Sequence, residues 1–414
     1  MDLLLGVDLT NQNKSQFCHG LPEWAQRPLI KKIFIETTVL GGEARIVGGA
    51  VRDWIAGYAI GDIDMAVNIP INKLAAKMAT QNIKVVETGL NHGTVTLSDQ
   101  EDSIEVTQTR VDLKTDGRHA VVAYQRDWAI DAARRDFTIN AIYMDKDGVF
   151  FDPLDGLKDL KRGRLRFAGD AGERIQEDAL RIIRYCRFWP RFSKCRIDQK
   201  TLNMLRKHAS LCKELSGERV ANEFRRIMVG GSLAQVIKLM HISNIDQAAL
   251  GIKFELLSQV ESKETSAILD QIDWLTCLVA LVPVGSSALI ANRLRLSRKE
   301  KRFFFRLDAG ISGAELARLN GKNWRQIAYH LGHWKTMLYV AQSLRNNVPI
   351  NVARYNELAS WRLPQSPICG ADLLSHGVDI GPRLGQMLRM AEKRWVSSDF
   401  ALGKPELLQW ILRN

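Results

Sequence analysis

The chain has 414 residues, of which 46% are hydrophobic and 25% charged, and its 58 Lys and Arg against 46 Asp and Glu give a formal net charge of +12. This average composition excludes a disordered, collagen-like or coiled-coil protein, and the length predicts two to four folded domains. The most apolar stretch, 274–285, is shorter than the roughly 20 residues of a membrane-spanning helix, and the N-terminus lacks the pattern of an export signal. We therefore expect a cytoplasmic protein without membrane attachment.

Positive charge is concentrated in one part of the chain. Residues 158–226 hold 19 Lys and Arg against 9 Asp and Glu, which accounts for ten of the twelve net positive charges. Such a concentration favours a partner that carries many phosphates, because Lys and Arg that neutralise phosphates release bound counterions. A solvated helix face is the alternative explanation that charge alone leaves open.

The apolar patterns predict an α+β N-terminal domain followed by helices. Up to about residue 165, short apolar runs typical of strands alternate with helical stretches, whereas the pattern after Gly172 follows the helical period almost throughout. No long Pro or Ser linker interrupts the chain, so we expect its parts to pack continuously. The predicted sheet of the N-terminal domain is mixed or antiparallel.

Two adjacent glycines follow the first predicted strand. Gly48 and Gly49 end the run ARIV and precede the helix-compatible segment AVRDWIAG. Backbone N–H groups at such a strand-to-helix turn bind phosphate, and Arg52, one helical turn further, would add positive charge. Two glycines alone do not specify a site, and the next motif along the chain sharpens the prediction.

Two aspartates stand close together ten residues after Arg52. Asp62 and Asp64 alternate with Ile63 and Met65, and residues two apart in a strand point to the same face. Two carboxylates on one face suit Mg²⁺, which prefers oxygen ligands. An isolated pair of this kind is more often structural or a loop cap, but its position shortly after the glycine turn predicts a metal site.

A third acid is predicted from a hairpin. The apolar segments 95–97 and 104–106 flank the polar turn 98–102, a pattern typical of two antiparallel strands. Alternation turns Glu105 to the face opposite its apolar neighbours. Glu105 is then either an exposed cross-strand partner or an active-site acid that completes the metal site or helps to deprotonate a hydroxyl. Its place after the aspartate pair favours the active-site role.

A helix with one basic face is predicted from Asp178 onward. At about 100° per residue, Arg181, Arg184 and Arg187 fall on the same side as Asp178, and the apolar residues between them fall on the opposite side. A solvated amphipathic helix would look similar, although it would usually mix Lys, Glu and Gln on its outer face. The pattern alone leaves both a solvated face and a ligand-binding face open.

Five segments between about 45 and 230 stand in a characteristic order: GGAVRD, GDIDMAV, TQTRVDLKTDGRHAVV, ARRDFTINAIYMDKDGVFFDPLDGLKDL and RIQEDALRIIRYCRF. In this order they resemble the head and neck of the class II tRNA nucleotidyltransferases, the CCA-adding enzymes, and of the closely related bacterial poly(A) polymerases. Beyond them, LRLSRKEK and ICGADLLSHGVDIGPRLGQMLRMAEKRW resemble the helical body and tail of the CCA-adding branch. The chain is identified as a member of this family.

The resemblance implies attack of an RNA 3′-hydroxyl on the α-phosphate of a nucleoside triphosphate, with pyrophosphate leaving. Asp62 and Asp64 would hold two Mg²⁺ ions, and the glycine turn with Arg52 would hold the triphosphate. Arg135 matches a nucleotide contact of the family. Asp136 lies in the motif associated with reading the ribose 2′-hydroxyl.

The resemblance also supplies a use for the basic helix. Asp178 and Arg181 correspond to the amino-acid template that selects the base, and Arg184 and Arg187 complete the nucleotide pocket. A carboxylate accepts from the exocyclic amine of cytosine or adenine and rejects the carbonyl oxygens of uracil and guanine, while the guanidinium donates to the adjacent ring acceptor. A site of this kind discriminates by ~10⁴ or more, so no nucleic-acid template is needed.

The family architecture divides the chain into four parts: an N-terminal extension (1–42), a catalytic head (43–165), a helical neck with the template (166–230), and a helical body and tail that bind tRNA (231–414). The expected partners are the acceptor and T arms of tRNA, with CTP, ATP and Mg²⁺. No membrane and no obligate protein partner is expected.

Two features favour complete CCA addition. Residues 110–119 resemble a loop that the family associates with the switch from adding C to adding A, and the Lys/Arg-rich C-terminal extension typical of the poly(A) polymerase branch is missing. An A-adding tRNA enzyme or a poly(A) polymerase is the alternative within the class. An RNA-binding protein with a decayed active site is the alternative outside it, disfavoured because the metal, triphosphate and template residues are all present.

Overall fold

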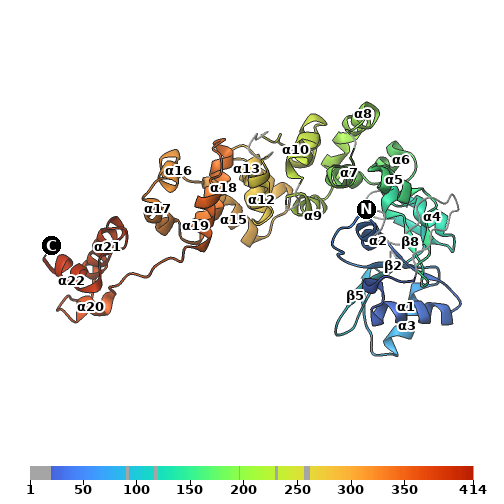
Figure 1. Ribbon diagram of the computed structural model, residues 1–414, viewed down its shortest axis with the longest axis horizontal. Helices are drawn as coiled ribbons and strands as arrows, with labels where there is room; N and C mark the ends of the chain where they lie inside the picture. Colours follow the sequence, from blue (N-terminus) through green and yellow to red (C-terminus); the bar gives the residue numbers. More distant parts are fainter. Residues whose placement is uncertain are drawn as a thin grey trace. The chain divides into compact units, whose positions relative to one another are not determined.

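The computed structural model describes residues 20–89, 93–115, 120–194, 196–228, 232–255 and 262–413. Within them, a mixed sheet with helices is followed by a remainder made of helices, so the predicted α+β fold class is confirmed (Figure 1). Two compact units are distinguished. One is Met1–Val220 with Leu239–Ala249, and the other is Ala221–Lys238 with Leu250–Asn414.

The first unit contains a seven-stranded sheet in the order β3-β4-β5-β2-β1-β8-β9 and a separate hairpin of β6 and β7. Strands β2 and β5 run parallel, and the other neighbours in the large sheet are antiparallel. The elements up to residue 162 are α1 (Pro28–Val39), β1 (Ala44–Val47), α2 (Gly49–Ile55), β2 (Asp64–Val67), α3 (Ile71–Ala79), β3 (Lys84–Gly89), β4 (Thr94–Ser98), β5 (Ser103–Gln108), β6 (Arg110–Thr115), β7 (Ala120–Tyr124), α4 (Trp128–Ala133), a 3-10 turn η3 (Thr138–Asn140), β8 (Tyr143–Met144), β9 (Phe150–Phe151) and α5 (Gly156–Arg162).

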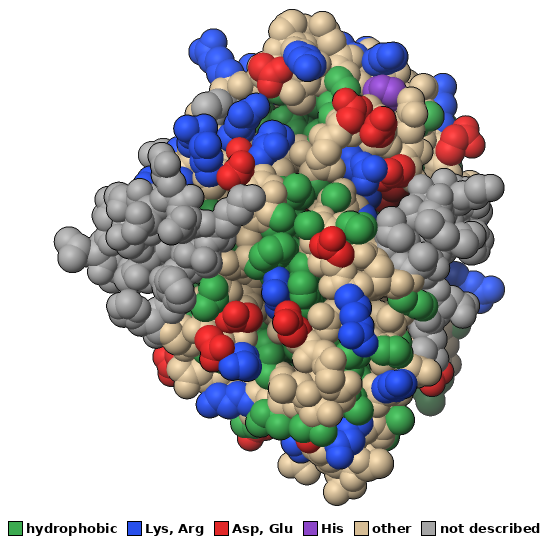
Figure 2. Space-filling model, turned by 90° about the vertical axis from the view of Figure 1, so that its right-hand side faces the viewer, with side chains coloured by type: hydrophobic (Ala, Val, Ile, Leu, Met, Phe, Trp, Pro, Cys, Tyr) green, Lys and Arg blue, Asp and Glu red, His purple; other side chains and the backbone are tan. Residues whose placement is uncertain are grey.

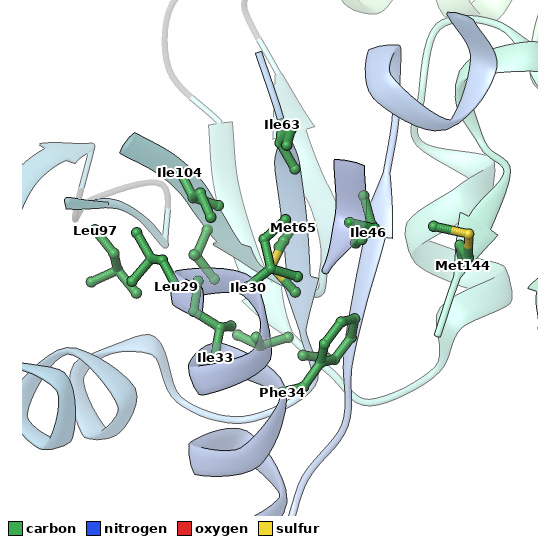
Figure 3. Packing of buried hydrophobic residues seen from close by; sticks show 14 of the residues in the cluster. Leu29, Ile30, Ile33, Phe34, Ile46, Ile63, Met65, Leu97, Ile104 and Met144 are labelled. Carbon is green, nitrogen blue, oxygen red and sulfur yellow. The ribbon is translucent and has the colours of Figure 1, made fainter. Parts of the chain in front are cut away.

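One face of the large sheet is covered by α1 and α3. Leu29, Ile30 and Ile33 of α1 are at most 1% exposed and pack against the apolar sides of the strands, as Figure 3 shows. The spacing of these residues places them on one side of a helix, where burial is favourable. Helix α1 therefore shares the core of the sheet, although it falls within the N-terminal segment 1–42 of the predicted division.

The opposite face of the sheet is apolar at one end and polar further on. Val47, Ala66 and Tyr143 point to this face and form a second buried cluster with Trp128 and other residues of α4. Strand residues alternate between faces, so Asp64, two positions before Ala66, lies on this same side of the sheet, beyond the cluster. The candidate active site is built there.

The segment 110–119, expected to form a loop, is partly a strand. Residues 110–115 form β6, which pairs with β7 across positions such as Arg110 and Tyr124. Residues 116–119 lie outside the described part of the chain. The backbones of the two strands pair in antiparallel register, which satisfies hydrogen-bonding groups that each strand alone would leave open.

Helices follow the sheet in the first unit, in agreement with the predicted helical pattern. Helix α7 buries Ile182, Ile183 and Cys186 and turns its arginines to the other side, so the predicted two-sided helix is confirmed over these residues. The helices up to residue 250 are α6 (Ala171–Glu177), α7 (Leu180–Phe192), α8 (Gln199–His208), a 3-10 segment η4 (Ala209–Glu214), α9 (Gly217–Met228), α10 (Leu233–Ile242) and α11 (Ile245–Leu250). The division between the two units falls within α9 and α10, and Ala221–Lys238 belong to the second unit.

Helices are the secondary structure of the second unit in its described residues. Its last helices enclose a small apolar core around Leu373, Trp395 and Leu407. No helix in the described ranges combines the length and the apolar character needed to cross a membrane. The helices are α12 (Lys263–Leu269), α13 (Trp274–Leu281), α14 (Ser287–Arg293), α15 (Arg298–Ala309), α16 (Gly313–Asn320), α17 (Trp324–Leu331), α18 (Lys335–Arg345), α19 (Val352–Ser360), α20 (Gly370–Leu374), α21 (Pro382–Ser397) and α22 (Lys404–Arg413).

Candidate active site

The glycine turn lies directly beside one of the predicted metal ligands. Val47, the last residue of β1, is the register partner of Asp64, the first residue of β2. Gly48 then takes φ 81° and ψ −134°, a conformation that glycine adopts far more readily than other residues. A Cβ added to Gly48 would lie 3.4 Å from Asp64 Oδ2, and one added to Gly49 would lie 3.7 Å from Arg52 Nη2. The backbone of the two glycines, which carries no side chains, therefore lies next to the Asp64 carboxylate and the Arg52 guanidinium.

The Arg52 side chain is buried and fully oriented. Its Nε and Nη2 donate to the two oxygens of Asp53, both at 2.9 Å, and its Nη1 donates to Asn140 Oδ1 at 2.6 Å. The guanidinium also lies over the rings of Phe188 and Phe192, at 4.8 and 4.6 Å from their centres. Burial lowers the pKa of Arg52, and the Asp53 charge opposes that shift. The predicted triphosphate residue thus reaches from the glycine turn toward α7.

The predicted acids come together at neighbouring positions of the sheet. Asp64 is paired in parallel register with Glu105 of β5, so the two side chains lie side by side on the same face. Ile63 and Met65 are 3% and 1% exposed, which confirms the predicted alternation, and Asp62 is exposed just before the strand. The predicted hairpin of β4 and β5 is also confirmed, with Glu105 opposite Thr96.

The carboxylates suit a divalent cation. Asp62 and Asp64 supply hard oxygen ligands, and Mg²⁺ is commonly held by one or two carboxylates together with phosphates of the substrate. Among the described residues, no group of three or more His, Cys, Asp and Glu side chains is placed to hold a metal ion. Asp62 and Asp64, two positions apart at the start of β2, stay the two predicted ligands. For Glu105 we carry forward the other expected role, assistance with proton removal.

Arg135 is anchored by a buried acid that the sequence analysis did not identify. Arg135 donates through Nη2 to Asp131 Oδ2 at 3.1 Å and through Nε to the Tyr143 hydroxyl at 3.0 Å. Arg134 also pairs with Asp131, at 2.7 Å, so the two arginines share one carboxylate that is 0% exposed. Burial raises the pKa of Asp131, but Arg135 and Arg134 outweigh it and lower the value to about 2. Asp131 is therefore a charged anchor for this segment.

Asp136 lies at the centre of a buried polar network. Its Oδ2 accepts from Arg184 Nε at 2.8 Å and pairs with Arg184 Nη2 at 2.6 Å, and its Oδ1 accepts from Asn140 Nδ2 at 2.9 Å. Burial opposes the ionisation of Asp136, but the charge of Arg184 and the hydrogen bonds keep its pKa below the usual value. Arg52 and Arg184, predicted separately, are thus joined through Asn140 and Asp136. Asn140 was not predicted, although it stands in the quoted segment RRDFTINA.

Asp178 does not belong to the helix in which it was predicted. Helix α6 ends at Glu177, α7 begins at Leu180, and Asp178 between them has the extended values φ −152° and ψ 102°. Its Oδ1 accepts from the Leu180 N–H at 3.1 Å, the side-chain-to-backbone bond with which Asp commonly interrupts a helix. Its Oδ2 accepts from Arg219 of α9 at 2.7 Å. No sequence signal marks Arg219 as this partner.

Asp178 and Arg181, the two predicted template residues, are each held by a separate set of partners. Arg181 donates through Nη1 to Glu177 at 2.7 Å and to the Arg174 carbonyl at 2.8 Å, and through Nη2 to the Arg134 carbonyl at 2.8 Å. Asp178 is ion-paired with Arg219 and Arg181 with Glu177, so the two residues have separate partners. Each template residue is oriented from outside the pair.

Arg187 is placed by an aromatic neighbour. Its guanidinium lies 4.1 Å from the ring centre of Phe188, and the guanidinium of Arg184 lies 5.4 Å from the same ring. The two arginines of α7 that were predicted to complete the nucleotide pocket therefore flank Phe188, with Arg52 on that ring as well. The described residues that the sequence analysis missed are Asp131, Asn140 and Arg219.

The chain matches two family models. Residues 44–166 match the poly A polymerase head domain, and residues 195–247 match a probable RNA and SrmB-binding site of polymerase A. The first match contains four of the five quoted segments, and the second lies beyond the fifth, which ends at residue 188.

Relatives with similarity along most of the chain are named CCA tRNA nucleotidyltransferase or CCA-adding enzyme. The mitochondrial CCA tRNA nucleotidyltransferase 1 of Homo sapiens is 30% identical over 384 residues, which cover 90% of this chain and 87% of that protein. Two solved structures share the fold. The Bacillus stearothermophilus CCA-adding enzyme in complex with CTP has a TM-score of 0.73 at 23% identity, covering 95% and 98% of the two chains. The Thermotoga maritima CCA-adding enzyme complexed with tRNA has a TM-score of 0.65 at 19% identity, covering 94% and 96%.

Proposed function

The chain belongs to the CCA tRNA nucleotidyltransferases, and from this premise we propose how its head and neck residues carry out the reaction. The protein adds the terminal CCA to the 3′ end of tRNA from CTP and ATP, and releases pyrophosphate at each addition. The observation that carries the proposal is the sheet register that places Asp64 between the glycine turn and Glu105. Phosphate contacts, metal-binding carboxylates and a further acid meet at this one point.

The glycine turn and Arg52 bind the triphosphate. Backbone N–H groups of Gly48 and Gly49 open α2, and a helix N-terminus favours a bound anion. Support comes from the absence of side chains at both positions, which lets phosphate approach the backbone closely, and from the orientation of Arg52 by Asp53 and Asn140. Arg135, which is ion-paired with Asp131, also contacts the nucleotide.

Asp62 and Asp64 hold divalent cations, which we propose to be Mg²⁺. When bound, such ions lower the pKa of an attacking hydroxyl and neutralise charge on the leaving oxygens. Asp64 is held in the sheet by register with β1 and β5, so its carboxylate is oriented before substrate binds. Glu105, exposed on the neighbouring strand, is placed to assist removal of the proton from the RNA 3′-hydroxyl.

Asp178 and Arg181 select the base. A carboxylate offers about four acceptor positions, so Asp178 can accept from an exocyclic amine in addition to the bonds from Leu180 and Arg219. Arg181 is fixed by Glu177 and two carbonyl oxygens, which leaves little freedom to adapt to a wrong base. Arg184 and Arg187 complete the pocket, and Asp136 reads the ribose.

The four-part division into 1–42, 43–165, 166–230 and 231–414 is retained as part of the proposal, with tRNA held by its acceptor and T arms along the helical parts. Support comes from the concentration of positive charge between residues 158 and 226. The cytoplasmic location remains a prediction, because the human relative is named as a mitochondrial enzyme.

The decisive experiment uses tRNA transcripts that end at the discriminator base, at C or at CC. Each transcript is incubated with CTP, ATP or both, in the presence of Mg²⁺, and the products are resolved at single-nucleotide length. We expect stepwise addition of C, C and A, each step dependent on the correct nucleotide. The Asp64→Ala variant, which lacks one of the two proposed metal ligands, serves as the control. It should add no nucleotide while still binding tRNA. Extension only with ATP, or beyond one A, would contradict the proposal.

A further inference from the structure

The side-chain amide of Asn140 joins two residues of the proposed nucleotide site. Its Oδ1 accepts from Arg52 Nη1 at 2.6 Å, and its Nδ2 donates to Asp136 Oδ1 at 2.9 Å. Asn140 lies in the 3-10 turn η3 and is 6% exposed. Arg52 comes from α2, 88 positions earlier in the chain, so the amide ties two distant segments of the head together.

The chemistry of the two neighbours requires a group between them that both accepts and donates a hydrogen bond. Arg52 can only donate and an ionised Asp136 can only accept, so the residue between them must accept on one side and donate on the other. An asparagine meets both requirements within one short side chain. Leucine of nearly the same volume would meet neither, and aspartate would place a second carboxylate against Asp136. A buried charged group without its partner costs more than an ordinary lost hydrogen bond.

Each neighbour is fixed on its far side by further contacts. Arg52 is held by both oxygens of Asp53 and lies on two aromatic rings. Asp136 is paired with Arg184 and accepts from the Phe137 N–H at 2.8 Å. Arg52 and Asp136 are each held on the side away from Asn140. On the near side, the Asn140 amide links the Arg52 guanidinium to the Asp136 carboxylate and so determines how the two are oriented toward each other.

We propose that Asn140 is a positioning residue that couples the triphosphate subsite at Arg52 to the ribose subsite at Asp136. This inference rests on the roles given to Arg52 and Asp136 in the proposed function. A small displacement of either group would move the triphosphate relative to the sugar, and misplacements of about 1 Å can cost about 10²-fold in rate. A purely structural Asn140 would affect stability and leave the reading of the sugar unchanged.

Thr138 provides a matched control within the same turn. It is 0% exposed, and its hydroxyl donates to Asp159 Oδ2 at 2.6 Å, away from Arg52 and Asp136. Thr138→Val keeps the shape of the side chain and removes a buried hydrogen bond to a carboxylate. The comparison therefore separates loss of a buried bond in η3 from loss of the particular bridge made by Asn140.

The test compares kcat/KM for CTP and dCTP on the transcript that ends at the discriminator base. For Asn140→Leu we expect kcat/KM with CTP to fall by about 10- to 100-fold. The ratio of CTP to dCTP should fall by about fivefold in both Asn140→Leu and Asn140→Asp, since each removes the donor to Asp136. Thr138→Val should lower the melting temperature and keep that ratio within about twofold of the unaltered chain. Both rates come from one preparation, so a partly unfolded sample leaves their ratio unchanged.

Two results would overturn the inference. One is a CTP-to-dCTP ratio that stays at the starting value in both Asn140 variants, and the other is an equal change in Thr138→Val. If the unaltered chain itself adds no C to the transcript, the proposed function fails first, and the role of Asn140 falls with it.

Discussion

Gly48 combines an unusual backbone conformation with contact to a proposed metal ligand. With φ at 81° and ψ at −134°, a side chain at this position would cost about 1–3 kcal/mol, and its Cβ would lie 3.4 Å from Asp64 Oδ2. We expect Gly48→Ala to lower both the stability and the rate of nucleotide addition, because the added methyl group fills the space between backbone and carboxylate.

Gly57 is the matched control for this change. It also has a positive φ, 75°, but a Cβ there would meet no atom within 4 Å. Gly57→Ala should lose stability to a similar degree and retain the rate per folded molecule. Urea denaturation and single-nucleotide addition assays on both variants separate strain from a direct effect on the site. Equal rates in the two variants would argue against a role for the bare backbone at Gly48.

The buried carboxylate of Asp131 gives a pH-dependent contribution to stability. Its pKa of about 2 lies below the ordinary value of 3.8, so the ionised form stabilises the fold above pH ~4 and this stabilisation is lost as pH falls toward 2. The shift corresponds to about 2 kcal/mol. We expect Asp131→Asn to lower the free energy of unfolding by about that amount at pH 7, with the difference narrowing between pH 4 and pH 3.

Asp127→Asn is the control for the charge change at Asp131. Asp127 is exposed and caps α4 by accepting from the Ala129 N–H at 2.8 Å, a role that Asn fills equally well. Its variant should unfold like the unaltered chain at each pH. A constant difference for Asp131→Asn from pH 7 to pH 3 would show that the pairing with the arginines does not depend on its charge.

At the scale of elements, the parallel pairing of β2 and β5 makes Glu105 the neighbour of Asp64. If Glu105 assists removal of the hydroxyl proton, Glu105→Gln should lower kcat by about 10²-fold and leave the KM for CTP nearly unchanged. Glu101→Gln, in the exposed turn of the same hairpin, should have no effect on either constant. If kcat and KM of Glu105→Gln stay within about twofold of the unaltered chain, Glu105 is an exposed cross-strand residue and not an active-site acid.

The proposed base selection depends on Asp178, which lies in the break between helices α6 and α7. Asp178→Ala should permit measurable incorporation of UTP and GTP, because the group that rejects carbonyl oxygens is removed, and use of CTP and ATP should fall. Arg219→Ala should relax base choice in the same direction but less, since Arg219 orients Asp178 through its bond of 2.7 Å.

Asp170→Ala provides the control for the loss of a cap at this helix pair. Asp170 caps α6 by accepting from the Glu173 N–H at 3.0 Å, and its removal should cost about 1 kcal/mol of stability without any change in base choice. Incorporation of each of the four nucleotides is measured on the transcripts ending at the discriminator base and at CC. If Asp178→Ala still adds only C and A at nearly normal rates, Asp178 is ordinary helix-cap structure.

For the whole molecule, binding of tRNA is expected to depend on its phosphate backbone. Basic side chains lie among acidic and apolar ones on the side drawn in Figure 2, and the net charge of the chain is +12. The logarithm of affinity should fall linearly with the logarithm of salt concentration, by about 0.7 to 0.9 per phosphate neutralised. Folded tRNA should bind tightly, whereas unstructured RNA of equal length should bind weakly. Equal affinity for both would favour a poly(A) polymerase.

Local patterns in the sequence were sufficient to predict much of the fold and to select the candidate site residues. The alternation around Ile63 and Met65, the hairpin that carries Glu105, and the two-sided helix α7 each depend on residues a few positions apart. Burial of one face against water acts over that range, and the resulting period is visible in the chain itself. The candidate metal ligands and the glycine turn could be selected because each motif is continuous in sequence.

The partners of the site residues were decided by the tertiary structure. Asp136 meets Arg184 across 48 positions, Asp178 meets Arg219 across 41, and Asn140 meets Arg52 across 88. Arginine side chains are long and have several donors, so the sequence does not determine which of many acceptors each one reaches. The same limit explains why Asp178 was placed inside a helix. Its bond to the Leu180 N–H competes with the helical pattern, and its ion pair with Arg219, distant in sequence, holds the side chain in this arrangement.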